Sequence, residues 1–187
     1  MNFFINESLF TKEGHIIIVK FKDKGLPLLR SILIQVFVFF VLFQAMSFFR
    51  ETSMLSTSTT LNDTITLPTL MGKPLAIKSQ GKTTVIYFFA PWCQICHLSI
   101  GNLQALYEKN DNLDVIAIAL DYSSVGEVSE FTAQHQLTFP IALGNAEIKN
   151  KFSISGYPSY YILDEQNTVK GKSLGYSSEL GLYLRSL

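Results

Sequence analysis

The sequence has few cysteines and no excess of charge, and each shortage excludes a class of protein. Only two cysteines occur among 187 residues, which is too few for a multi-disulfide scaffold or a four-cysteine zinc site. Fifteen basic and fifteen acidic side chains balance, and no segment is basic enough to indicate a nucleic-acid partner. Hydrophobic residues make up 48% of the chain and charged residues 16%, a composition too apolar for a disordered protein. We therefore expect one folded domain with an appendage.

One long uncharged run lies near the N-terminus. Residues 31–49 read SILIQVFVFFVLFQAMSFF, long enough for a helix that crosses the roughly 30 Å hydrocarbon core of a bilayer. Basic residues up to Arg30 precede the run, so the positive-inside rule places residues 1–30 in the cytoplasm and exports the C-terminal part. We expect an uncleaved single-pass transmembrane helix. The alternatives are a signal peptide cleaved near Ser47, and a translation start near Val19 that gives a short basic lead.

The remainder of the chain has the pattern of an α/β domain. Residues 50–62 are rich in Ser and Thr and lack Gly and Pro, which predicts a polar, extended linker rather than a packed element. Residues 63–187 have the size of one small domain. Apolar runs predict strands at 83–90, 115–120, 159–163 and 169–176, and helical spacing predicts helices at 93–109, 126–136, 146–152 and 179–187. This alternation, with a closing hairpin, predicts a central mixed sheet flanked by helices.

The two cysteines form a C-x-x-C motif where a buried strand ends and a helix begins. Cys93 and Cys96 are one helical turn apart, so their sulfurs can come within bonding distance. Unpaired N–H groups and the positive end of the helix dipole favour a thiolate at Cys93. We predict that Cys93 is the nucleophile that attacks a partner disulfide and that Cys96 resolves the mixed disulfide.

Two other interpretations of the cysteine pair stay open. The pair is half of a zinc site if two histidines complete it, and only His15, His97 and His135 are available. The pair is also compatible with a purely structural disulfide, although so short a loop constrains little chain entropy.

A proline immediately before an apolar strand adds a second signal. Pro158 lies in the segment Ser155–Tyr160, SGYPSY, where an ordinary turn is the simplest reading. Taken together with the W-C-x-x-C motif that precedes it, however, the segment resembles the thioredoxin fold.

From about Leu67 to the C-terminus, the chain resembles the membrane-anchored thioredoxin-like proteins of the TlpA/ResA/DsbE group. It also resembles the D-type oxidoreductases named for suppression of copper sensitivity. The resemblance implies short lead-in strands around Gly72, a cis bond at Pro158 beside the cysteines, and substrate contacts from Trp92, Tyr157 and Pro158, with the client strand pairing at Tyr157.

The resemblance also implies an activity and a location. It predicts an envelope thiol–disulfide oxidoreductase, more often a reductant, that acts on exported client proteins. It predicts a membrane electron-transfer protein as redox partner, no cofactor or metal, and a bacterial inner-membrane location with an extracytoplasmic domain.

Some residues depart from the family pattern. Tyr87 and Ser99 stand where relatives carry acids that assist proton transfer, and Gln94 and Ile95 replace the usual Gly-Pro spacer. His97 supplies a charge or a proton there, or is an ordinary helix-surface histidine. Two other functions are alternatives: a copper-binding metallochaperone, for which His135 is the candidate histidine, and a peroxidase-like redoxin, whose Thr/Ser-rich pocket the sequence lacks.

Overall fold

The computed structural model describes residues 25–52 and 54–187, with side chains for 30–45 and 54–187. The chain divides into two compact units, residues 1–44 and 45–187. The expectations for residues 1–24 lie outside the described residues.

Helix α1 (Gly25–Thr52) contains the uncharged run of the sequence and extends beyond it at both ends. Large apolar side chains from Ile32 to Phe43 are exposed along it. Within residues 30–45 and 54–187, whose side chains the structure describes, no helix is long and apolar enough to cross a membrane.

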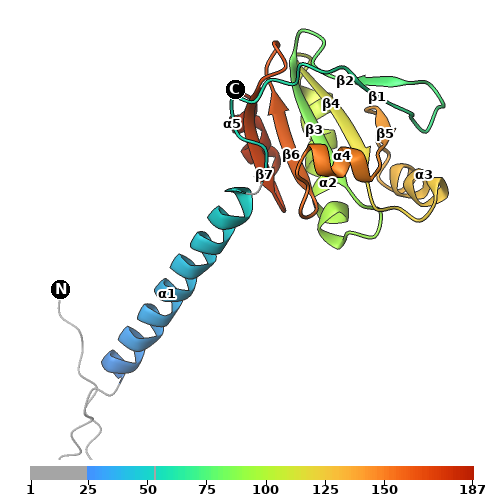
Figure 1. Ribbon diagram of the computed structural model, residues 1–187. Coiled ribbons are helices and arrows are strands. Elements are labelled where there is room, and N and C mark those ends of the chain that lie inside the picture. The colour runs from blue at the N-terminus through green and yellow to red at the C-terminus, as the bar shows by residue number, and fades with distance from the viewer. Residues whose placement is uncertain (1–24, 53) are drawn as a thin grey trace, which may run out of the picture. The chain divides into compact units, whose positions relative to one another are not determined.

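The C-terminal unit is built on a five-stranded mixed sheet (Figure 1), in the order β5-β4-β3-β6-β7. β3 pairs with β4 in parallel and with β6 in antiparallel fashion, so it occupies the centre. β5 extends the parallel side, and β7 closes the antiparallel hairpin with β6. The strands are β3 (Thr83–Phe89), β4 (Leu113–Ala119), β5 (Ile141–Leu143), β6 (Ser159–Leu163) and β7 (Val169–Leu174).

Alternating side chains of the central strand supply two cores. Val85, Tyr87 and Phe89 pack with residues of three helices on one face, while Ile86 and Phe88 pack with the fourth helix of this unit on the other. Both faces of β3 are therefore buried, which explains its continuous apolar sequence. The first three helices are α2 (Gln94–Lys109), α3 (Val125–Gln134) and α5 (Glu179–Ser186), and the fourth is α4 (Ala146–Lys151).

The sequence predicted these four helices and four of the five strands to within a few residues. It missed β5, because three residues after Pro140 are too short for a periodic pattern. The lead-in strands that the resemblance implied are present as β1 (Ile65–Leu67) and β2 (Leu75–Ile77), which pair antiparallel on either side of Gly72.

The linker expected at residues 50–62 is corrected by the structure. α1 continues to Thr52, and Met54 is buried with 4% of its surface exposed. The Ser58 N–H donates to the Val169 carbonyl at 2.8 Å, and the Leu61 N–H donates to the Asn167 carbonyl at 3.0 Å. The Ser/Thr-rich segment is not a free tether, because main-chain hydrogen bonds and scattered apolar side chains fasten it to the β6–β7 hairpin.

Candidate functional site

Cys93 lies immediately before the first residue of helix α2. It is the N-cap, with extended backbone angles of φ −79° and ψ 109°, and its Sγ accepts the Cys96 N–H at 3.2 Å. Its carbonyl accepts the N–H groups of Cys96 and His97 at 3.0 and 3.2 Å, which starts the helical hydrogen bonding. The sulfur therefore takes the place of a capping oxygen and lies at the positive end of the helix dipole.

The two sulfurs differ in access to solvent. Cys93 retains 7% of its surface exposed and Cys96 none, and both are free thiols. Burial raises the pKa of the Cys96 thiol well above its ordinary value, and hydrogen bonding with Cys93 raises it further. An incoming disulfide can therefore meet only Cys93 directly, while Cys96 lies behind it as a protonated thiol.

The residues predicted to bind substrate, Trp92, Tyr157 and Pro158, form a rim beside the two cysteines. The Tyr157–Pro158 peptide bond is cis, as the sequence resemblance implies. The Trp92 ring, 61% exposed, packs edge-on against the Tyr157 ring with 5.9 Å between centroids. The segment before Cys93 and the segment before β6, far apart in sequence, therefore share one surface.

Asp121 joins these segments and was not predicted. The Trp92 indole N–H donates to the Asp121 carbonyl at 2.8 Å, and the Tyr157 hydroxyl donates to its carboxylate at 2.9 Å. Lys149 forms an ion pair with the same carboxylate, and its Nζ lies 5.6 Å from the Tyr157 ring centroid. The Lys149 ammonium is the main cause that holds the pKa of Asp121 below its usual range. A main-chain acceptor leaves no trace in sequence, so no pattern could have revealed this role.

Hydroxyl groups lie near Cys96, at positions 87 and 99, where the family resemblance implies acids. The Tyr87 hydroxyl is 3.4 Å from the Ser99 hydroxyl, which in turn is 3.5 Å from the Cys96 carbonyl oxygen. The Tyr160 ring packs on Tyr87 at 4.9 Å between centroids, and its buried hydroxyl has no hydrogen-bond partner among the described residues. Burial, with Cys96 nearby, raises the pKa of Tyr87 well above its ordinary value, so these groups stay neutral.

His97 and His135 meet, although 38 positions separate them in the sequence. His97 Nδ1 is 2.8 Å from His135 Nε2, and His97 Nε2 is 2.8 Å from the Pro91 carbonyl oxygen. Burial and the neighbouring His97 lower the pKa of His135 below its usual range. His97 is thus a partly buried, hydrogen-bonded group rather than the ordinary surface histidine considered from the sequence.

The placement of the histidines also bears on the metal interpretations. Within residues 30–45 and 54–187, no three His, Cys, Asp or Glu side chains are grouped so as to hold a metal ion. His135 is hydrogen-bonded to another histidine. The donor set that a zinc site or a copper metallochaperone needs is therefore not assembled by the described residues.

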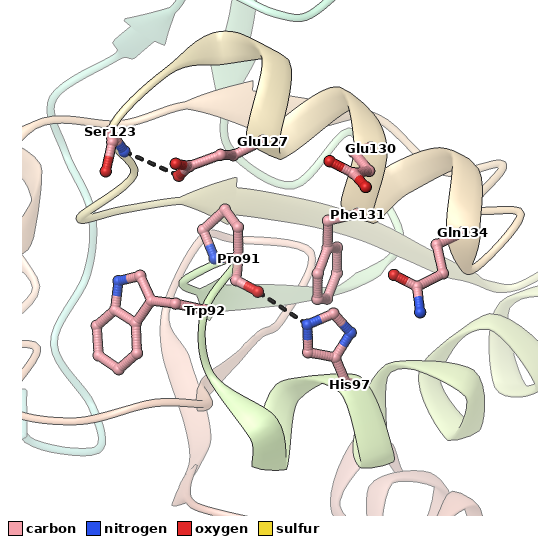
Figure 2. Close-up of a pocket in the computed structure, with 8 residues that line it drawn as sticks. All are labelled: Pro91, Trp92, His97, Ser123, Glu127, Glu130, Phe131 and Gln134. Carbon is pink, nitrogen blue, oxygen red and sulfur yellow. Dashed lines mark hydrogen bonds between the residues drawn. The ribbon is translucent and has the colours of Figure 1, made fainter.

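A hollow of about 330 Å³ opens beside the redox motif (Figure 2). Pro91, Trp92 and His97 form one side of it, and α3 supplies the other with Glu127 and Phe131. The Glu127 carboxylate accepts the Ser123 N–H at 3.0 Å and so helps to cap the N-terminus of α3. The hollow places ring and carboxylate groups next to the exposed Trp92.

These features, a helix-capping C-x-x-C after a central strand and a cis-proline segment beside it, define a thioredoxin-like redox domain. The AhpC/TSA family matches residues 62–172, and the chain belongs to that family.

Curated relatives agree with this assignment. The chain is 30% identical to the thioredoxin-like protein YneN of Bacillus subtilis over 113 residues, 58% of this chain and 66% of YneN. It is 25% identical to the sporulation thiol-disulfide oxidoreductase A of Bacillus subtilis over 114 residues, 58% of this chain and 69% of the relative. It is 27% identical to the thiol-disulfide oxidoreductase ResA of Bacillus cereus over 110 residues, 57% and 63% of the two chains. The matches thus span about two thirds of each relative.

Solved structures confirm the fold. StoA from Bacillus subtilis superposes with a TM-score of 0.61 at 21% identity, covering 69% of this chain and all of StoA. A secreted Mycobacterium tuberculosis disulfide oxidoreductase homologous to Escherichia coli DsbE gives a TM-score of 0.59 at 22% identity, covering 66% and 94%. The expected thioredoxin-like α/β fold is therefore correct.

Proposed function

We propose that the protein is a thiol–disulfide oxidoreductase that exchanges disulfides with exported proteins through Cys93 and Cys96. The observation that carries the proposal is the placement of a slightly accessible sulfur at the start of α2 directly in front of a fully buried one. The names of the relatives support the same activity.

The first step is attack by the Cys93 thiolate on a client disulfide. One client sulfur bonds to Cys93, and the other leaves as a thiolate that takes a proton from solvent. The Cys96 N–H, which points at Cys93 Sγ, stabilises negative charge on that sulfur before the attack.

The second step closes the internal disulfide. Cys96 loses its proton to solvent and attacks Cys93 Sγ, so that the Cys93–Cys96 bond forms and the client's second sulfur leaves. Two electrons have passed to the client, which gains two protons, and the pair is oxidised. Because burial disfavours the Cys96 thiolate, this step waits for the proton to leave.

The client binds across the rim formed by Trp92, Tyr157 and Pro158. The exposed Trp92 ring offers apolar contact, and the main chain around Tyr157 pairs with an extended client segment as an added strand would. This arrangement accepts many clients, because main-chain pairing reads no particular side chain.

The direction and the location complete the proposal. The protein acts as a reductant that a membrane electron-transfer protein recharges with two electrons and two protons. Residues 31–49 anchor it as a single transmembrane helix in a bacterial inner membrane, with the redox domain outside the cytoplasm. The exposed apolar side chains from Ile32 to Phe43 support the anchor, and the uncharged run continues to Phe49.

Disulfide exchange and client trapping test the activity. Cys93→Ala is expected to abolish reduction of insulin, whereas Cys96→Ala is expected to accumulate mixed disulfides with client proteins, because the resolving sulfur is gone. Cys93→Ala with Cys96→Ala together is the control that must trap nothing. Insulin reduction that survives Cys93→Ala contradicts the proposal.

The reduction potential of the pair tests the direction. A value near about −270 mV, measured against glutathione, supports a reductant, and a value near about −120 mV makes the protein an oxidant.

A further inference from the structure

Three aromatic rings pack against one another at tilted angles between the start of α2 and the end of α3. His97 and His135 each pack on Phe131, with centroids 4.6 and 4.7 Å away, and lie 5.0 Å from each other. Phe131 is buried and stacks in turn on Phe89, the last residue of β3, at 4.7 Å. The two imidazoles therefore rest on a fixed platform that begins in the central strand.

The hydrogen bonds of the pair fix where its protons lie. A carbonyl oxygen only accepts, so His97 Nε2 must carry the hydrogen that it donates to Pro91 (Figure 2). When the pair is neutral, His97 Nδ1 accepts from the His135 Nε2–H, and one extra proton keeps the bond between the rings, since one imidazole then carries hydrogens on both of its nitrogens. A second extra proton would set N–H against N–H, so the intact pair holds at most one positive charge.

The same bonds connect the pair to both cysteines. Pro91 precedes Cys93 by two residues, and His97 directly follows Cys96. The His97 ring thus ties the loop that enters the motif to the first turn of α2, while its main-chain N–H donates to the Cys93 carbonyl at 3.2 Å. Because the loop leads into Cys93 and α2 carries Cys96, a displacement of the loop relative to α2 alters the separation of the two sulfurs, and disulfide geometry tolerates little displacement.

We propose that His97 and His135 are positioning residues for the redox pair, with His97 clamping the Pro91 carbonyl and His135 holding the His97 ring in its donating tautomer. This inference rests on the proposed function. The clamp keeps Cys93 in place while its sulfur exchanges the Cys96 N–H for a bond to the Cys96 sulfur. Among the described residues, the carboxylates of Glu127 and Glu130 share the hollow with His97, and the thiols of Cys93 and Cys96 lie at the same end of α2.

Two substitutions at His97 distinguish the effect of its hydrogen bond to Pro91 from the effect of having an imidazole ring. In His97→Gln the amide nitrogen reaches the place of Nε2 and keeps the bond to Pro91, whereas in His97→Asn it reaches only the place of Nδ1. We expect His97→Asn to slow glutathione exchange about tenfold and to shift the exchange equilibrium at least about threefold, with His97→Gln close to wild type. Equal exchange rates and equilibria in His97→Asn and wild type overturn the proposal.

Substitutions at His135 test the second half of the pair. His135→Gln keeps a donor for His97 Nδ1 but cannot titrate, so we expect a wild-type exchange rate at pH 7.5 whose pH dependence between about pH 5 and 7 is flattened. His135→Ala loses the donor, and we expect the rate to fall as in His97→Asn. Full activity and an unchanged pH profile in His135→Ala contradict the role.

Nitrogen-15 chemical shifts of the imidazoles in the full chain give a readout that needs no variant of the pair. We expect His97 to carry its hydrogen on Nε2 above pH 7.5, also in the Cys93→Ser protein, which has no exchange activity under the proposed function. The Nδ1–H tautomer at His97 overturns the clamp. If the wild type shows the expected tautomer but no exchange activity, the proposed function is contradicted while the clamp is not.

Discussion

Two adjacent tyrosines of β6 carry hydroxyl groups in opposite situations. The Tyr161 hydroxyl donates to the Phe152 carbonyl at 2.6 Å and accepts the Leu55 N–H at 2.9 Å, while the Tyr160 hydroxyl has no partner among the described residues. A buried polar group without a partner costs free energy, whereas removal of a bonded one leaves its partners unsatisfied. The same chemical change at neighbouring positions should therefore have opposite effects.

We predict that Tyr160→Phe leaves the free energy of unfolding unchanged or raises it by about 1 kcal/mol, and that Tyr161→Phe lowers it by about 2 kcal/mol. Urea unfolding of the two variants and the wild type provides the comparison. A large loss of stability in Tyr160→Phe would show that its hydroxyl is bonded after all.

The lowered pKa of Asp121 gives a pH dependence of stability. A carboxyl whose pKa is depressed in the folded protein contributes stability that is present above its unfolded pKa, about 3.9, and is lost as the pH falls through the folded pKa. We predict that Asp121→Asn lowers the free energy of unfolding by about 0.5 kcal/mol at pH 5, the size expected of a half-exposed ion pair, and that the difference disappears below about pH 3. Lys149→Met, which removes the main cause of the shift, should show the same trend. A difference that grows toward low pH contradicts the assignment.

Elements are constrained most tightly where their backbones approach each other. A Cβ added at Gly144, after β5, would lie 2.8 Å from Ile118 Cγ2 and 3.1 Å from the Ala119 carbonyl oxygen. A Cβ added at Gly101, in the middle of α2, would meet nothing within 4 Å. One glycine is therefore required by the packing of β5 on β4, and the other is not.

We predict that Gly144→Ala destabilises the protein by about 2 kcal/mol through overpacking, while Gly101→Ala stabilises it by about 0.5–1 kcal/mol through helix propensity. Thermal unfolding monitored by circular dichroism measures both, with each variant serving as the control of the other. Gly144→Ala with a wild-type midpoint would mean that β5 shifts freely against β4.

Sequence reasoning succeeded for elements whose evidence is local. The apolar run of β3 and the C-x-x-C motif after it are contiguous in the sequence. They sufficed to predict that Cys93 is the more accessible cysteine and that Cys96 lies behind it. It failed for the 54–62 segment, because Ser and Thr richness hides main-chain bonds to distant residues. The His97–His135 bond depends on how α3 packs on α2, which no pattern along the chain records.

At the scale of the whole molecule, the proposed transmembrane helix predicts firm attachment to a membrane. If residues 31–49 span a bilayer, alkaline carbonate should leave the full-length protein in the membrane pellet, since about 20 apolar residues are buried in hydrocarbon. An impermeant maleimide should then label Cys93 in intact spheroplasts, with the Cys93→Ala protein as the blank. Release by carbonate, or labelling only after lysis, contradicts the anchor or its orientation.

The central position of β3 has a consequence for the order of synthesis. Its parallel neighbour β4 follows after one helix, but its other neighbour, β6, comes only after α3, β5 and α4 have been made. Until then one edge of β3 is open, and Trp92 lacks Tyr157 beside it. The emerging chain therefore passes through a period in which both thiols are made but unsheltered, so its own oxidation competes with completion of the sheet.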